Sequence, residues 1–247
     1  MDYARYNPEP TLALNGDIVN DYAEFSGQDA YDVFEKMNHF HDLNKANFVD
    51  NGSDPHKFYA DSNTYVYDLL TAHSDTTGTP NKLNKFLPNV MANMKNHPGK
   101  TFLEFGGGIG DLCQIMATWG EKEVTYMDIQ SHITDFAKWR FEKYDLLIKT
   151  QVIPQESFEL AQKYDIIFQD AVLEHLPPLK QITYTDKLCS GVNTGGLFIM
   201  IVDLSGENPD MPMHYNVDIK AVHDVIEQNG FKCETGRNTF ASAWTKL

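Results

Sequence analysis

The chain has 247 residues, of which 42% are apolar and 12% aromatic, and its formal net charge is −15, so we expect a soluble globular protein with a sizeable core. Three widely spaced cysteines argue against a disulfide framework, and the longest apolar run, residues 197–202, is too short to cross a bilayer, which favours a reducing, cytoplasmic location. Only three of the 20 basic residues are arginines and no basic cluster occurs, so we expect no nucleic-acid partner.

The first 97 residues show helical patterns without any sign of a sheet. Thr79 is placed as a helix N-cap and Pro80 lies in the first turn that follows. Apolar residues recur at helical spacing in two runs, which are Phe34, Met37 and Phe40, and then Leu83, Phe86, Leu87, Val90, Met91 and Met94. We therefore expect residues 1–97 to form a helical cap and residues 98–247 to form a second domain.

A tyrosine cluster lies within the predicted cap. Tyr59, Tyr65 and Tyr67 surround an apparent helix start at Asp61 or Ser62. Tyrosine rings can wall an apolar pocket and attract a cation, and they also serve in ordinary packing. Both interpretations stay open for this cluster.

After residue 98, short apolar runs alternate with helical patterns. The predicted strands are residues 101–105, 124–127, 149–153, 164–168, 197–202, 231–234 and 239–244, and the predicted helices begin at Asp111 and Ser131 and cover residues 217–228. Alternating strands and helices predict an α/β fold with a parallel sheet and helices on both faces.

The most informative segment joins the first strand to its helix through Gly106, Gly107, Gly108 and Gly110. Glycines permit positive φ angles and let a ligand approach bare backbone, and a simple turn rarely needs four of them. The dinucleotide pattern G-x-G-x-x-G fails from each possible starting glycine. Asp111 would also place a negative charge beside a pyrophosphate at the helix N-terminus, so the loop favours a phosphate-free, cationic ligand.

The pattern Glu104-x-Gly106-x-Gly108-x-Gly110, with Asp128 at the end of the next strand, resembles the class I S-adenosylmethionine-dependent methyltransferases. Residues 164–177 resemble the fourth strand of the small-molecule members, and residues 195–203 resemble the fifth strand. The resemblance implies a Rossmann-like seven-stranded mixed sheet with helices on both faces, plus the N-terminal helical cap. It also implies S-adenosylmethionine as cofactor, with S-adenosylhomocysteine as product.

In that family the glycine loop holds the methionine part and the sugar, and the acid at the second strand end binds the ribose diol, for which a carboxylate offers two acceptor oxygens. The adenine is expected near the end of the third strand. The cofactor-binding residues implied by the resemblance are Glu104, Gly106, Gly107, Gly108, Gly110, Asp128, Ile129, Gln155, Glu156, Asp170 and Ala171.

Candidate catalytic residues are Asp170, His175 and Tyr65, and candidate substrate-binding residues are Tyr59, Tyr65, His175, His214 and Tyr215. His175 has an ordinary pKa near 6.5, and either takes a proton from the acceptor or packs against the following loop. Asp170 and Asp203 resemble the metal-binding acids of catechol methyltransferases, but Leu204 stands where those enzymes have asparagine. We therefore expect no metal.

These observations predict a methyltransferase that acts on a small-molecule acceptor, with no nucleic-acid or membrane partner. The oligomeric state is not indicated. The alternatives are a protein or RNA methyltransferase, and a protein that binds S-adenosylmethionine but cleaves or senses it without methyl transfer. The sequence that follows the fourth strand lacks the Asn-Pro-Pro-Tyr pattern typical of amino-group methylation in nucleic acids.

Overall fold

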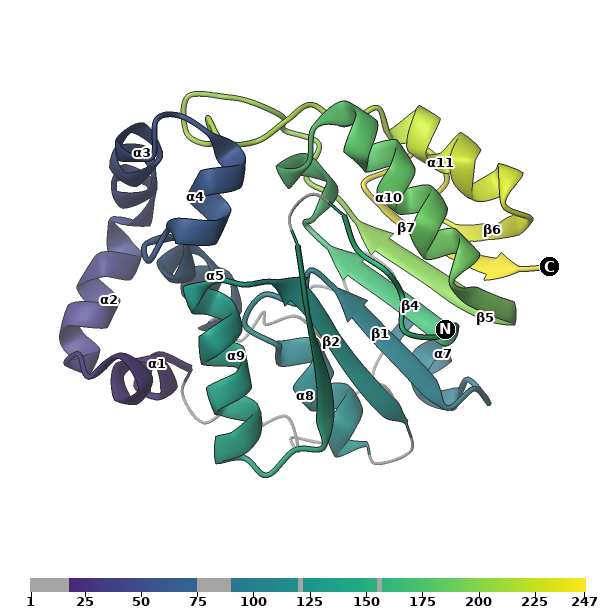
Figure 1. Cartoon of the computed structure of the whole chain (residues 1–247), viewed down its shortest axis with the longest axis horizontal. Helices are drawn as coiled ribbons and strands as arrows, with labels where there is room; N and C mark the ends of the chain where they lie inside the picture. Colours follow the sequence, from purple (N-terminus) through teal and green to yellow (C-terminus); the bar gives the residue numbers. More distant parts are fainter. Residues whose placement is uncertain (1–17, 75–89, 120–121, 155–156) are drawn as a thin grey trace, which may run out of the picture.

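A computed structural model describes residues 18–74, 90–119, 122–154 and 157–247 (Figure 1). Its helices are α1 (Ile18–Ser26), α2 (Ala30–Asn38), α3 (Phe40–Asp50), α4 (Pro55–Asp61), α5 (Tyr65–Ser74), α7 (Val90–Asn96), α8 (Asp111–Thr118), α9 (His132–Lys143), the 3₁₀ turn η3 (Leu173–His175), α10 (Pro178–Ser190) and α11 (Ile219–Gln228). Its strands are β1 (Thr101–Phe105), β2 (Glu123–Ile129), β3 (Ile148–Ile153), β4 (Tyr164–Asp170), β5 (Val192–Ile201), β6 (Phe231–Thr235) and β7 (Ala241–Lys246).

The strands form one seven-stranded sheet in the order β3-β2-β1-β4-β5-β7-β6. Strands β1 to β5 are parallel, whereas β7 runs antiparallel to both β5 and β6. The predicted mixed sheet is therefore confirmed, although β5 begins earlier and β7 later than the sequence pattern indicated. Because the parallel strands end at one edge, the loops that follow β1, β2, β4 and β5 meet there.

Helices cover both faces of this sheet, as predicted. Buried side chains of α7, α8 and α9 pack on one face, and those of α10 and α11 pack on the other. Strand residues alternate between the two layers: Phe102 faces the first and Leu103 the second. This alternation is the period-2 pattern of a strand buried on both sides.

The helix expected over residues 83–94 is only partly visible. Its first part, with Thr79 and Pro80, lies outside the described residues. The described part is α7, whose Val90 and Met94 are buried against Phe102 in the core of the sheet. The described part of this helix therefore packs with the sheet domain.

Helices α1 to α5 form the cap. Side chains of α1, α2 and α5 pack around Ile109 of the glycine loop and against Ile133 and Phe136 of α9. Figure 1 shows α1 to α3 beyond α9, on the side of the molecule opposite to α11, β6 and β7. The cap thus covers one end of the sheet and leaves the other end to the C-terminal elements.

A buried ion-pair network joins the cap, the glycine loop and α9. Arg140 has no exposed surface, and its Nη1 donates to Asp111 Oδ1 at 2.6 Å while its Nε lies 3.4 Å from Asp21 Oδ2. Asp21 also accepts hydrogen bonds from Tyr144 Oη at 2.7 Å and from Lys143 Nζ at 2.9 Å. The cap is therefore anchored by charge as well as by apolar packing. None of the described helices is long and apolar enough to span a membrane.

Candidate active site

A cavity of about 710 Å³ lies at the carboxyl edge of the parallel strands, beneath the cap. Its walls come from the loop after β1, the ends of β2 and β4, the turn η3, helices α4 and α5, and the loop after β5. The volume falls within the range of roughly 300–1,000 Å³ that is usual for small-molecule sites. The topology therefore gathers residues as far apart in the chain as His56 and Phe240 around one space.

Three of the four predicted glycines line this cavity, namely Gly106, Gly107 and Gly108. Gly106 and Gly108 have φ angles of +69° and +52°, which favour glycine. A Cβ atom on Gly106 would lie 2.4 Å from Val172 Cγ2, so no larger residue fits there without displacing its neighbour. The loop consequently presents bare backbone to the cavity.

Gly110 is the fourth glycine for which cofactor binding was predicted. It is the N-cap of α8, with a φ angle of +79°, and it is not part of the described cavity wall. A Cβ atom at this position would lie 2.5 Å from the ring of Phe141. Gly107 lines the cavity, yet a Cβ there would lie 2.6 Å from the ring of Tyr126. Packing inside the protein is therefore sufficient to account for glycine at both positions.

Asp128 ends β2 beside the glycine loop. Its Oδ2 accepts a hydrogen bond from the Gly108 N–H at 2.8 Å, and its Oδ1 accepts one from the Ile129 N–H at 2.7 Å. The Tyr126 hydroxyl donates to the Gly108 carbonyl at 2.8 Å and so fixes the same turn. Burial raises the pKa of Asp128 to about 6, although the two backbone hydrogen bonds oppose this shift. At neutral pH the carboxylate is mostly ionised and keeps lone pairs for a ligand's hydroxyl groups.

Two other acids surround the loop. Glu104 lines the cavity and its Oε2 accepts from the Cys113 N–H at 3.0 Å, while burial raises its pKa to about 8. Burial alone would also raise the pKa of Asp111, but Arg140 and His73 lower it to about 2. The charge of Asp111 is thus neutralised by its partners. Our sequence argument, which treated Asp111 as a free charge opposed to a pyrophosphate, is wrong on this point.

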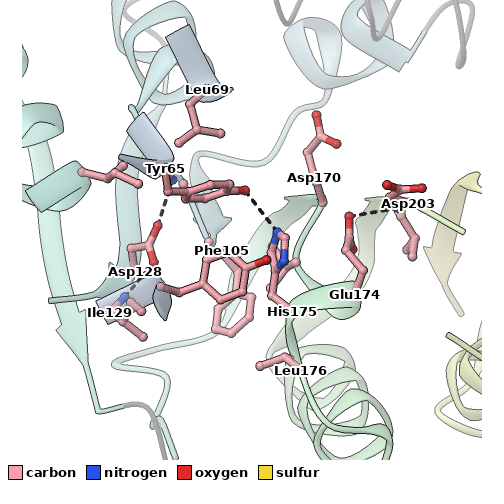
Figure 2. Close-up of a pocket in the computed structure, with 18 of the residues that line it drawn as sticks. Tyr65, Leu69, Phe105, Asp128, Ile129, Asp170, Glu174, His175, Leu176 and Asp203 are labelled. Carbon is pink, nitrogen blue, oxygen red and sulfur yellow. Dashed lines mark hydrogen bonds between the residues drawn. The ribbon is translucent and has the colours of Figure 1, made fainter. Parts of the chain in front are cut away.

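The other end of the cavity brings together four predicted residues. The Tyr65 hydroxyl lies 3.3 Å from His175 Nε2, and Figure 2 shows this contact between Asp128 on one side and Glu174 on the other. The ring centroids of Tyr59 and His214 lie 4.2 Å and 5.0 Å from that of His175. Burial, and secondly His214, hold the pKa of His175 well below its ordinary value. His175 is therefore neutral at physiological pH.

The remaining predicted residues divide between the cavity wall and other parts of the protein. Tyr67 packs against Tyr22 inside the cap, with ring centroids 5.7 Å apart. Tyr215 does not line the cavity as it is described, and its backbone N–H donates to the Glu174 carbonyl at 2.7 Å. Asp170 and Ala171 do line it, and Ala171 has a strained φ angle of +53°. Ile129 also lines the cavity, and Gln155 and Glu156 lie outside the described residues.

Sequence reasoning missed Glu174. Its side chain has no exposed surface although it lines the cavity, and its Oε1 accepts from the Asp203 N–H at 3.0 Å. Burial raises its pKa to about 8. The available signal was an acid directly beside His175, after a buried strand, at the edge where ligands bind. No group of three or more acidic, histidine or cysteine side chains within the described ranges is placed to hold a metal ion.

The methyltransferase domain family matches residues 79–240, which is well over half of the chain. The chain belongs to this family. The predicted methyltransferase activity and its S-adenosylmethionine cofactor are thereby confirmed. No significant match to a curated protein was found.

Solved structures share the fold of this methyltransferase. The PH0226 protein from Pyrococcus horikoshii OT3 is 15% identical with a TM-score of 0.58, and the match covers 75% of this chain and all of that one. Magnesium protoporphyrin IX methyltransferase from Synechocystis PCC 6803, solved with bound S-adenosylhomocysteine, is 17% identical with a TM-score of 0.51, over 66% of this chain and 80% of that one. TehB from Haemophilus influenzae is 17% identical with a TM-score of 0.52, and the match covers 64% of this chain and 61% of that one.

The residues present fit the cofactor of this family. The positive φ angles at Gly106 and Gly108 turn the loop along the cavity wall, and the missing side chain at Gly108, where a Cβ would meet only Leu69 at 3.5 Å, leaves backbone open to a ligand. Asp128 is oriented by two backbone hydrogen bonds and retains acceptor capacity for a vicinal diol. The acidic wall also suits a ligand that carries a sulfonium and an ammonium group.

Proposed function

We propose that this methyltransferase acts on a small-molecule acceptor that is enclosed between the cap and the carboxyl edge of the sheet. One observation carries the proposal: a single cavity of about 710 Å³ is lined both by the glycine loop with Asp128 and by Tyr59 and Tyr65 of the cap. The cofactor and the acceptor would therefore bind side by side in the same cavity, with the cap covering both. A cavity roofed by helices suits a small acceptor better than a folded macromolecule.

The cofactor's place follows from the chemistry of the wall. We assign its methionine part and sugar to the backbone of Gly106 and Gly108, its ribose hydroxyls to Asp128, and its adenine to the side of Ile153 and Pro154. When bound, it supplies an electrophilic methyl group on a sulfonium that leaves as a neutral thioether. The cap, which we take as helices α1 to α5 with α7 belonging to the sheet domain, excludes water from the acceptor.

The chain's own residues then hold the acceptor in line. Tyr65 and His175 are joined across the cavity at 3.3 Å, so both can orient an acceptor atom between the two ends. His175 is neutral and able to accept a hydrogen bond, whereas burial lowers its pKa and so disfavours its taking a proton. Asp170, at the end of β4, lines the same wall. We therefore give His175 and Tyr65 direct contact with the acceptor.

The test is to incubate the protein with methyl-labelled S-adenosylmethionine and, separately, a metabolite extract, a protein extract and total RNA. Mass spectrometry should find the label in a small molecule. Label found only in protein or RNA would contradict the small-molecule proposal. Consumption of the cofactor without a labelled product would instead favour the cleavage alternative.

The role of the cap is tested by Tyr65→Ala and Tyr59→Ala. Both variants should lose methyl transfer far more than affinity for S-adenosylhomocysteine, because the two tyrosines line the acceptor end. Tyr67→Ala, which alters a tyrosine of the same helix that packs inside the cap, is the matched control for a loss of cap packing. Melting temperatures of all three variants separate unfolding from a change in the site.

A further inference from the structure

The acceptor end contains a buried acid with one carboxyl oxygen unpaired. Glu174 lines the cavity although it has no exposed surface, and its Oε1 accepts from the Asp203 N–H at 3.0 Å. Its Oε2 has no hydrogen-bond partner in the part of the chain that the structure describes. Figure 2 shows Glu174 between His175 and Asp203. Because a buried polar atom without a partner is costly, Oε2 indicates a ligand at this wall.

The position of the Glu174 proton decides what that ligand must offer. Burial raises the pKa of Glu174 to about 8, so the acid is mostly protonated at pH 7. Oε1 accepts the Asp203 N–H and is therefore the carbonyl oxygen of the acid, which leaves the proton on Oε2. Glu174 thus presents an O–H donor to the cavity and not a negative charge.

A second buried hydroxyl in the same wall also lacks a partner. The Tyr59 hydroxyl, on a side chain that is 9% exposed, has no hydrogen bond to any described residue. Burial, and secondly Tyr65, raise the pKa of Tyr59 well above its ordinary value, so this hydroxyl keeps its proton. Glu174 contributes to the same shift and is therefore within electrostatic reach of Tyr59. The wall carries two buried donors that await an acceptor.

These donors narrow the chemistry of the ligand. A carbonyl oxygen has two lone pairs and can accept from O–H donors. A carboxylate could accept as well, but the described residues that line the cavity include no lysine or arginine to compensate its charge. An ammonium group would bring more donors to two groups that already donate. A neutral carbonyl compound matches both the hydrogen bonding and the charge.

On these grounds, and resting on the methyltransferase function proposed above, we propose that the acceptor end recognises a neutral carbonyl compound, whose oxygen accepts from Glu174 Oε2 and Tyr59 Oη. The rings of Tyr59 and Tyr65, with centroids 5.0 Å apart, add an aromatic wall for the body of that compound. Glu174 and Tyr59 therefore determine which acceptors bind, whereas the methyl group comes from the cofactor.

The experiment uses the full chain saturated with S-adenosylhomocysteine and four planar probes of one shape. These are acetophenone, its hydrocarbon analogue α-methylstyrene, the anion benzoate and the cation benzamidine. Ligand-observed NMR titrations should show that acetophenone binds at least about tenfold more tightly than each of the others. If acetophenone fails to bind at millimolar concentration, or another probe binds as tightly, the carbonyl assignment is overturned. Failure of S-adenosylhomocysteine itself to bind would count against the proposed function instead.

Substitutions of Glu174 distinguish a donor from an acceptor. In Glu174→Gln the amide oxygen can still accept from the Asp203 N–H and the amide N–H₂ replaces the donor, so acetophenone affinity at pH 7 should stay within about threefold. Glu174→Met has a similar length and no donor, and should lose about tenfold. Tyr59→Phe keeps the ring, removes the second donor and should lose about threefold or more.

The matched control is Glu123→Gln, at the opposite edge of the sheet where β2 begins, which should leave acetophenone affinity unchanged. Wild-type affinity in a folded Glu174→Met or Tyr59→Phe protein would overturn the proposal. A tenfold loss in a folded Glu174→Gln protein would also overturn it, because such a loss shows that the acid is required as an acceptor.

A pH titration of acetophenone binding covers the case in which Glu174→Met does not fold. The groups that face Glu174 are Asp170 of β4, Asp203, His214 and Tyr215 of the segment after β5, Tyr59 and Tyr65 of the cap, and the adjacent His175. Burial raises the pKa of the three tyrosines and lowers that of both histidines, so the tyrosines stay protonated near pH 7 and the histidines stay neutral at higher pH.

Wild-type affinity for acetophenone should therefore fall about tenfold between pH 7 and pH 9, as Glu174 loses its donor proton. Glu174→Gln cannot lose this proton and should show a much smaller fall. Glu104, whose pKa is also about 8, titrates in both proteins and cancels in the comparison. A flat wild-type profile, or equal falls in the two proteins, would overturn the role of Glu174.

Discussion

The two ends of the cavity are built in different ways. The glycine loop and Asp128 lie within 25 residues of chain, on two adjacent parallel strands, and are fixed by backbone hydrogen bonds such as that from the Gly108 N–H to Asp128. The acceptor end combines η3 with α4, α5 and the segment after β5. Its groups meet through side chains, as Tyr65 meets His175. The cofactor end is therefore determined by contacts between neighbouring segments of the chain, whereas the acceptor end depends on how the cap packs against the sheet domain.

Arg140 joins the glycine loop to helix α1 of the cap, and its replacement should have the largest effect. Arg140→Leu removes the buried guanidinium from Asp111 and Asp21 and leaves them His73 and Lys143 as ion-pair partners among the described residues, so we expect a loss of about 3 to 5 kcal/mol in the free energy of unfolding. Lys143→Met, which removes a partly exposed partner of Asp21, should cost less than about 1 kcal/mol. Denaturant titrations of both variants measure the difference. Equal losses would show that the buried pair is not the anchor.

The glycines of the loop divide into packing and ligand positions. Gly110→Ala forces a left-handed alanine, at about 1 to 2 kcal/mol, and adds a clash with Phe141 worth about 1 to 3 kcal/mol more. Gly108→Ala should cost only the backbone strain, because its Cβ meets Leu69 at an ordinary 3.5 Å. That methyl group would lie on the cavity wall, so Gly108→Ala should lower cofactor affinity further. Thermal melts with and without S-adenosylhomocysteine distinguish the two variants.

Substitution of Asp128 tests the cofactor end of the cavity separately from the acceptor end. Asp128→Ala should weaken cofactor binding by about 1 to 3 kcal/mol, the scale of hydrogen bonds to a charged group. Asp135→Ala on the exposed side of α9 removes an equal charge and should leave affinity unchanged. Binding of S-adenosylhomocysteine by calorimetry provides the measurement. Wild-type affinity in Asp128→Ala would remove this residue from the site.

The buried acid of the cofactor end should make stability depend on pH. The pKa of Glu104 is about 8 in the folded protein against an ordinary 4.5, so folding favours its protonated form. Its contribution to stability is present below pH 4.5 and is lost as the pH rises through 8, with a slope of at most about 1.4 kcal/mol per pH unit. Unfolding titrations between pH 6 and 8 should show a smaller decline in Glu104→Gln than in the wild type. Identical slopes would contradict the shift.

Much of the cofactor end of the cavity could be predicted, because the residues that form it are close together in the sequence. A strand, a run of glycines, a helix and a second strand ending in Asp128 follow one another, and backbone geometry requires their residue types. The same alternation indicated the parallel sheet and both helical layers. The sequence could not distinguish Gly107 and Gly110 from the glycines that face a ligand. A glycine that is required by packing against Tyr126 or Phe141 gives the same sequence pattern as one required by a ligand.

The sequence by itself thus determined the sheet, the glycine loop, Asp128 and the family, since these depend on periodicity and on contacts between neighbouring segments. Only the tertiary structure decided that Tyr65 faces the cavity while Tyr67 faces the cap, and that α7 packs on the sheet. It also decided that Arg140 neutralises Asp111 and that Glu174 Oε2 is buried without a hydrogen-bond partner among the described residues. These properties arise from burial and from charges brought together across long stretches of chain, and no local pattern carries them.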